Sequence, residues 1–138
     1  MINDILSGDF SWIIALISAI TIHEFSHALI ADFLGDPTPR LMGRLSLNPL
    51  KHLDPLGTLF MLFTRFGWGK PVPIDPFNLK EPRKDSALIS IAGPTSNLLL
   101  ALVLSLFLNF LPGAGLFYAI VFPVIATNVG LAVFNLLP

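Results

Sequence analysis

Three long apolar runs limit the possible folds of this sequence more than any other feature. They cover Phe10–Leu34, Ala87–Leu111 and Leu116–Leu137. Each is long enough for a helix that crosses a bilayer, which needs ~20 mostly apolar residues. Charged residues make up 12% of the chain, well below the ~25% of soluble domains. We therefore predict an all-α polytopic membrane protein with three main transmembrane helices.

A shorter apolar run and two loop-like stretches separate the first two spans. Leu56–Phe66 is too short to cross a bilayer comfortably, which favours a re-entrant or interfacial segment. Gly67–Asp75 is rich in glycine and proline, so we expect it to be extended. Leucines at even spacing in Leu41–Leu47 predict a small strand-like piece of the loop, although a solvated loop fits this composition equally well.

The first apolar run contains the pattern H-E-x-x-H, formed by His23, Glu24 and His27. Residues four apart lie on the same face of a helix, so the two imidazoles can point at one metal ion. Glu24 is turned about 100° from His23, which suits a general base acting on a metal-bound water. The pattern predicts a metal site in which His23 and His27 are ligands and Glu24 is catalytic.

Simpler interpretations exist for the polar residues. His23 and His27 can be buried histidines that bond to neighbouring helices, but an ionisable residue inside a span costs about 2.5–3.5 kcal/mol, and such residues are usually functional. His52 and Asp54 can bind metal or serve as polar loop groups. We favour the loop role, since their spacing matches neither helical nor tetrahedral ligand geometry.

The distribution of charge predicts how the chain is oriented. All eight lysines and arginines lie between Arg40 and Lys84, so the positive-inside rule places the loop 35–86 in the cytoplasm. The protein is then an integral, multi-pass membrane protein, in the cell membrane if the organism is a prokaryote. No basic patch with interleaved aromatics suggests nucleic-acid binding, and the chain has no cysteine, so it can form neither a disulfide nor a thiolate metal site.

Several motifs in order make the chain resemble the site-2 protease family of intramembrane zinc metalloproteases. They are the H-E-x-x-H pattern inside a span, Gly-Arg-Leu-Ser-Leu-Asn-Pro from Gly43 to Pro49, Gly93-Pro94-x-x-Asn97, and the terminal Asn135-Leu136-Leu137-Pro138. The resemblance implies Zn²⁺ as cofactor and a transmembrane protein in the lipid bilayer as substrate. It makes His23 and His27 zinc ligands and Glu24 the base, and it places Asn97 and Asn135 as candidate substrate-binding or oxyanion groups.

The chain departs from the family's pattern in one respect. The family's third zinc ligand is an aspartate that follows the Asn-x-x-Pro motif by a few residues, and this chain stops at Pro138. We therefore expect residues 1–138 to form a single intramembrane metalloprotease domain whose C-terminal part, with the third ligand, lies beyond Pro138. Asp54 is a possible substitute, without a geometric reason to expect it.

The expected activity is hydrolysis of peptide bonds in or near transmembrane segments, as in regulated intramembrane proteolysis. A substrate helix must unwind before cleavage, and Leu41–Leu47 or Lys70–Ile74 are candidates to pair with it as an added strand. Two alternatives remain: a non-catalytic regulatory or binding module that keeps the protease fold, and a metal transporter. The sequence does not indicate an oligomeric state.

Overall fold

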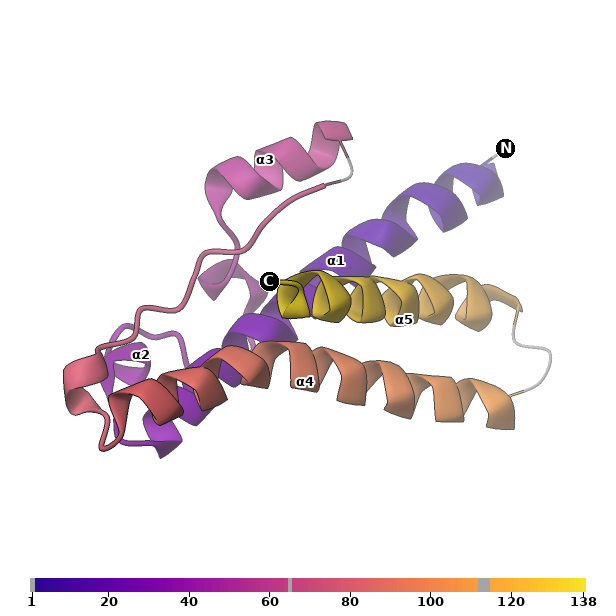
Figure 1. The fold of residues 1–138 in the computed structure, drawn as a ribbon. Coiled ribbons are helices and arrows are strands. Elements are labelled where there is room, and N and C mark those ends of the chain that lie inside the picture. The colour runs from indigo at the N-terminus through magenta and orange to yellow at the C-terminus, as the bar shows by residue number, and fades with distance from the viewer. Residues whose placement is uncertain (1, 65, 112–114) are drawn as a thin grey trace.

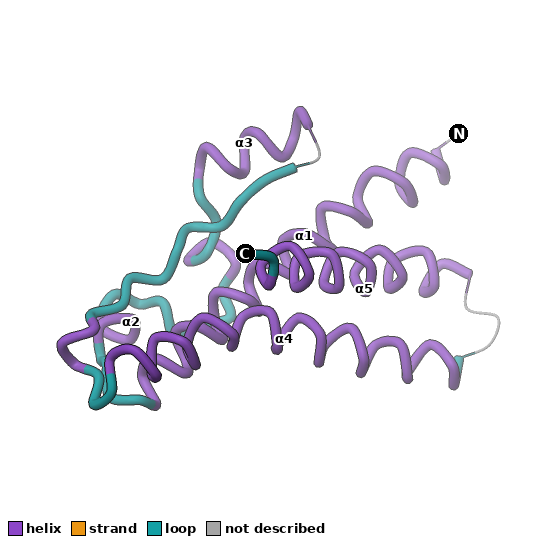
Figure 2. Tube along the Cα trace, viewed as in Figure 1, coloured by secondary structure: helices purple, strands orange, loops and turns teal. Residues whose placement is uncertain are grey.

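The computed structural model describes residues 2–64, 66–111 and 115–138. Its elements in chain order are α1 (Ile2–Phe33), α2 (Thr38–Leu41), the 3-10 turn η1 (Pro49–Lys51), α3 (Pro55–Thr64), a second 3-10 turn η2 (Pro76–Asn78), α4 (Pro82–Phe110) and α5 (Gly115–Leu136). Figure 1 shows α4 and α5 side by side, with α1 crossing them. Most of the non-helical chain belongs to the connection from α1 to α4, which Figure 2 shows in teal around α2 and α3.

Three of the described helices are long and apolar enough to cross a membrane: α1 from Ser11 onward, α4 and α5. Each of them contacts the other two. The buried alanines are distributed over all three helices: Ala15, Ala19, Ala28, Ala31, Ala101 and Ala132. Small side chains let helices approach closely inside a bilayer, where apolar burial gives little driving force. The predicted all-α polytopic membrane fold is confirmed.

α4 begins earlier than the apolar run that predicted it. Its first residue is Pro82 rather than Ala87, because proline is favourable at the first position of a helix, where its missing N–H costs nothing. The Asp85 carboxylate accepts a hydrogen bond of 2.9 Å from the backbone N–H of Glu81 and so satisfies one free donor of the first turn. This added turn extends α4 into the polar loop.

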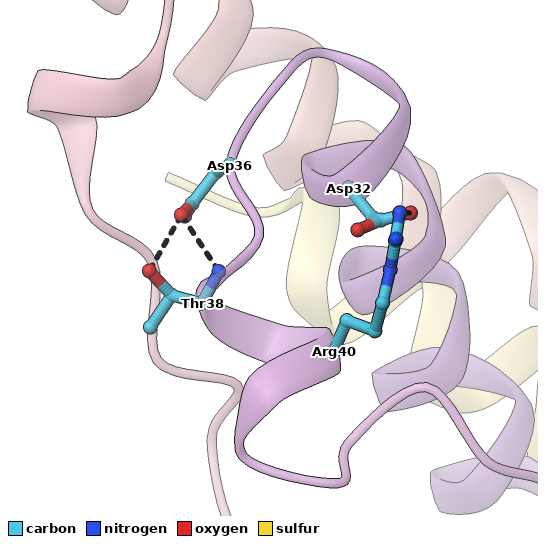
Figure 3. A network of polar contacts seen from close by, with 4 residues as sticks. All are labelled: Asp32, Asp36, Thr38 and Arg40. Carbon is cyan, nitrogen blue, oxygen red and sulfur yellow. Dashed lines mark hydrogen bonds and ion pairs between the residues drawn. The ribbon is translucent and has the colours of Figure 1, made fainter.

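A glycine ends α1 and places a buried carboxylate directly after it. Gly35 has φ +110°, and the Asp36 N–H donates to the Ala31 carbonyl at 3.0 Å, as expected of a helix end with glycine in a left-handed conformation. Figure 3 shows Asp36 accepting two hydrogen bonds from Thr38, and a separate ion pair joins Arg40 to Asp32 at 2.5 Å.

Asp36 fastens the loop to the end of α1. It is fully buried and accepts further hydrogen bonds from the Asp75 N–H at 2.7 Å and the Asn78 side chain at 3.0 Å. Burial alone would raise the pKa of Asp36, but these bonds and those from Thr38 outweigh it, so the pKa lies below its usual value. The carboxylate therefore stays ionised and holds η2 against α1.

A second helix end with a glycine in a left-handed conformation occupies the stretch Leu41–Leu47, where a strand was predicted. Leu41 closes α2, Gly43 adopts φ +70°, and the Arg44 N–H donates to the Pro39 carbonyl at 2.8 Å. A residue with positive φ turns the chain out of an extended conformation, so no strand forms in this described stretch and the prediction of a strand is wrong. The alternative, a loop, is what the structure has.

α3 and the segment after it form a separate arm beside α1 (Figure 1). α3 has ten residues, too few to cross a bilayer. Its glycine lies so close to the following segment that a Cβ on Gly57 would stand 2.4 Å from the Trp68 carbonyl oxygen. Beyond Trp68 the chain stays extended as predicted, with a single antiparallel bridge between Gly69 and Leu53.

Candidate functional site

The two histidines of the H-E-x-x-H pattern lie one helical turn apart on α1, and both ring Nδ1 atoms are bonded to α4. His23 Nδ1 lies 2.6 Å from Asn97 Oδ1, and His27 Nδ1 lies 2.6 Å from the Ile89 carbonyl oxygen. A carbonyl oxygen only accepts, so each Nδ1 carries the proton and donates it. Each Nε2 therefore keeps a free lone pair, which is the tautomer of a metal-binding histidine held by an outer partner.

A chain of amides fixes the orientation of His23. The Asn97 amide nitrogen donates to the Ala19 carbonyl at 3.0 Å and to Asn128 Oδ1 at 2.7 Å, and this leaves its oxygen to face His23. The Asn128 nitrogen donates in turn to the Val124 carbonyl at 2.8 Å. Both asparagines are fully buried, and their hydrogen bonds link α5, α4 and α1 directly.

The two free Nε2 atoms converge beside Gly93. A Cβ built on Gly93 would stand 2.5 Å from His27 Nε2 and 2.7 Å from His23 Nε2. Only glycine leaves this space open to both lone pairs, and the two rings meet edge-on with centroids 4.6 Å apart. A space that any larger side chain would fill, faced by two imidazole nitrogens, fits a first-row transition metal such as zinc.

The described residues supply two protein ligands for this position and no third. No group of three or more His, Cys, Asp or Glu side chains that could hold a metal occurs in the described part of the chain. Asp54 is not a substitute, since its carboxylate accepts from the Gly57 N–H at 2.8 Å and caps α3. His52 is fully buried and its Nε2 donates to the Ser46 carbonyl at 2.5 Å. The preferred loop roles of His52 and Asp54 agree with these contacts.

Glu24 lies where two cavities meet. A cavity of about 500 Å³ and one of about 280 Å³ are both lined by His23, Glu24 and Asn135. The extended segment closes this side of α1, because a Cβ on Gly69 would stand 3.5 Å from Glu24 Cγ. A carboxylate beside the histidines and open to a cavity can exchange a proton with a molecule that enters.

The structure separates the two candidate asparagines. Both amide hydrogens of Asn97 are used by protein acceptors and the side chain is fully buried, so Asn97 orients His23 here. A contact of Asn97 with substrate or an oxyanion stays a prediction. Asn135 is exposed, borders both cavities, and donates to the Leu131 carbonyl at 2.8 Å. Its role in binding substrate remains a prediction.

Arg44, a member of the Gly43–Pro49 motif, belongs to the site, a role that the sequence alone did not indicate. It is 5% exposed, and its guanidinium donates to the Pro71 carbonyl at 3.0 Å and to the Lys70 carbonyl. Burial lowers the pKa of Arg44, and the charge of Glu24 opposes that shift. Arg44 thus holds the extended segment near Glu24. The available signal was its place in the Gly43–Pro49 motif, directly after Gly43.

Comparison with known proteins agrees with this site. The family model "Peptidase family M50" matches residues 11–127. A Bacillus subtilis protein named "Putative zinc metalloprotease YwhC" is 41% identical over 138 aligned residues, covering 91% of this chain and 62% of that protein. Two proteins named "Putative zinc metalloprotease Rip2", from Mycolicibacterium smegmatis and Mycobacterium tuberculosis, are 35% and 34% identical over 70% and 71% of this chain.

The chain spans less than two thirds of these relatives, with 39% of the Mycolicibacterium smegmatis protein and 40% of the Mycobacterium tuberculosis protein covered. No solved structure matches it.

Proposed function

Because the chain belongs to peptidase family M50, the site-2 protease family, we propose that it forms the core of an intramembrane zinc metalloprotease. Its substrates are membrane proteins, cut in or near a transmembrane segment. One observation carries the proposal: the two Nε2 lone pairs of His23 and His27 converge on an open space beside Gly93, next to Glu24. Ionisable side chains inside a membrane span cost free energy, so they are usually retained for a function such as binding a metal ion.

In this proposal His23 and His27 hold the zinc, and Asn97 and Ile89 hold the histidines. When bound, zinc polarises the scissile carbonyl and makes a water molecule more acidic. The third protein ligand would come from residues that follow Pro138. Asn135 supports this, because it places the C-terminal end of α5 at both cavities beside His23.

Glu24 moves the proton. Its carboxylate takes a proton from water while the water oxygen bonds to the carbonyl carbon of the scissile peptide. The carbon–nitrogen bond then breaks, and Glu24 gives the proton to the leaving amine. Water is consumed, one new carboxyl group and one new amine are formed, and Glu24 returns to its starting state.

The extended segment supports a way to present the substrate. Of the two stretches considered for strand pairing, only Lys70–Ile74 is extended, whereas Leu41–Leu47 is a turn and loop. Arg44 holds this segment beside Glu24 through the Lys70 and Pro71 carbonyls. An unwound substrate that pairs with the segment would gain backbone hydrogen bonds that the bilayer cannot offer.

The test uses the natural full-length protein, reconstituted in liposomes with a single-span model substrate. We expect Glu24→Gln to abolish cleavage while bound zinc, measured by elemental analysis, stays unchanged. Glu81→Gln is the matched control, since the Glu81 side chain is exposed and, among the described residues, its ion pair is with Lys84 at 3.4 Å. Cleavage by Glu24→Gln at the wild-type rate would overturn the mechanism.

The same preparation separates the other two functions. A zinc-free wild type that binds the substrate without cutting it would indicate a non-catalytic module. Zinc crossing the liposome membrane without proteolysis would indicate a transporter. The absence of a third ligand in the described residues is the observation that favours the non-catalytic module.

A further inference from the structure

The two cavities at Glu24 follow one another along the same two elements. Along α1, the larger cavity touches Leu16 and Ile20, and the smaller one touches His27. Along the extended segment, the larger cavity is lined by residues 66–69 and the smaller one by residues 71, 72 and 74. A peptide lying beside this segment would therefore pass from one cavity to the other at Glu24.

The two cavities differ in size and chemistry. The larger, at about 500 Å³, is walled mainly by aromatic and aliphatic side chains: Leu16, Ile20, Phe66, Trp68, Leu131 and Phe134. The smaller, at about 280 Å³, includes Ser90, His27 and the edge of the extended segment. The larger volume lies inside the ~300–1,000 Å³ range of ligand sites and the smaller one just below it.

We propose that the larger cavity is a specificity pocket for a bulky apolar or aromatic substrate side chain on one side of the scissile bond. This inference rests on the proposed proteolytic function and adds the substrate class that the site selects. The occupant follows from the lining, because His23 and Glu24 form part of the wall. Whatever fills the cavity is therefore adjacent to the reacting peptide.

Gly130 on α5 sets the size of this pocket. It lines the larger cavity, and a Cβ built on it would meet no heavy atom of the described residues within 4 Å. A longer side chain at this position would enter the cavity without displacing the protein. Gly130 lies on α5, whereas His23 and His27 lie on α1 and Gly93 on α4, and the open space at Gly130 leaves room for a side chain without pushing these residues.

The test measures cleavage of paired substrates by the full-length protein. One substrate carries Phe or Leu beside the scissile bond and the other carries Ala. We expect Gly130→Leu to lower cleavage of the bulky substrate at least about tenfold relative to the Ala substrate, as pocket-filling by a few methylenes does. Gly130→Ala should give a smaller shift. Gly115→Leu is the control, since Gly115 also has no described neighbour within 4 Å but lines neither cavity.

A second readout does not depend on turnover. Residues 1–138 contain no cysteine, so once any cysteine elsewhere in the full-length protein is replaced by serine, Gly130→Cys in the Glu24→Gln background introduces a single thiol. Mild oxidation should cross-link this thiol to a substrate cysteine placed at the bulky position. It should not cross-link to a substrate cysteine placed three residues away, on the other side of the scissile bond. Gly115→Cys should cross-link to neither substrate position.

The outcomes separate the two proposals. If the wild type cuts nothing, the proteolytic function fails, and this inference fails with it. If the wild type cuts but Gly130→Leu lowers both substrates equally or neither, and Gly130→Cys cross-links to no substrate position, the pocket assignment alone is overturned. If Gly130→Leu loses zinc, the Gly130→Ala cleavage ratio and the Gly130→Cys cross-link decide whether the larger cavity is the specificity pocket.

Discussion

Groups on α4 that are not themselves metal ligands determine whether the two histidines can bind a metal. Asn97 and the Ile89 carbonyl select the proton position on each ring, and Gly93 leaves the space that the rings face. The H-E-x-x-H letters predict two ligands and a base, and they cannot predict this support, because it comes from α4, more than sixty positions away. The Gly93-Pro94-x-x-Asn97 motif can be assigned to this support only once α4 is known to pack against α1.

Replacing Asn97 tests this support. We expect Asn97→Leu to lower the zinc affinity of the full-length protein about 10–100-fold, because removal of an outer partner frees the histidine ring. Competition with a chromophoric chelator measures the change. Asn109→Leu is the control: Asn109 is exposed near the other end of α4 and lines neither cavity, so zinc affinity should be unchanged. Equal affinities in wild type and Asn97→Leu would contradict the orienting role.

His52 makes stability depend on pH. Burial lowers its pKa most, the bond to the Ser46 carbonyl opposes this, and the charge of Arg44 lowers it further. The folded pKa is thus below the unfolded value of about 6.5. The contribution of neutral His52 is fully present above pH ~6.5 and is lost as pH falls through the lowered folded pKa, because the unfolded state takes up the proton first.

Thermal unfolding between pH 7.5 and 5.5 measures this effect. We expect the wild type to lose more stability over this interval than His52→Gln, which cannot titrate there. All other titrating groups are common to the two proteins, so their contributions cancel in the comparison. Parallel losses in the two proteins would show that His52 binds its proton equally well folded and unfolded.

Among the helices, length and apolarity were enough to predict α1, α4 and α5, because a bilayer demands ~20 apolar residues whatever the partners are. The loop was harder to predict. Its course depends on two buried charged residues, Asp36 and Arg44. Each directly follows a glycine with positive φ, Gly35 or Gly43, at which the chain changes direction. A strand was predicted at Leu41–Leu47 from alternation alone, and the positive φ of Gly43 overrides that pattern.

α3 presents an apolar surface that the described chain does not cover. Phe63 is 81% exposed and Leu56 is 70% exposed, and Leu59 and Leu62 are exposed beside them. A helix this short and apolar lies at the membrane surface or dips into it. A reporter on Phe63→Cys should be quenched by lipids that carry a shallow nitroxide, and one on Phe77→Cys, which is 98% exposed in the polar loop, should not. Equal quenching at both positions would rule out membrane contact specific to α3.

In the whole molecule, the polar loop and the C-terminal end of α5 both lie beside the candidate site. Asp36 and Arg44 fasten the loop to the site end of α1, and Asn135 brings the end of α5 to the same cavities. If α1, α4 and α5 each cross, the loop and the C-terminal end of α5 share one side of the membrane, and the C-terminal end of α4 lies on the other. All eight lysines and arginines are on the loop side, which the positive-inside rule assigns to the cytoplasm.

Thiol labelling in cells tests that assignment, since residues 1–138 contain no cysteine and any cysteine elsewhere in the protein can be replaced by serine. A membrane-impermeant maleimide should label Leu111→Cys, an exposed position at the end of α4, in intact cells. Lys80→Cys, exposed in the loop, should be labelled only after the membrane is permeabilised. The reverse pattern would put the loop outside the cell. It would also place Glu24 in the outer half of the span, so that water would reach the carboxylate from the outside and the unwound substrate would have to enter from there.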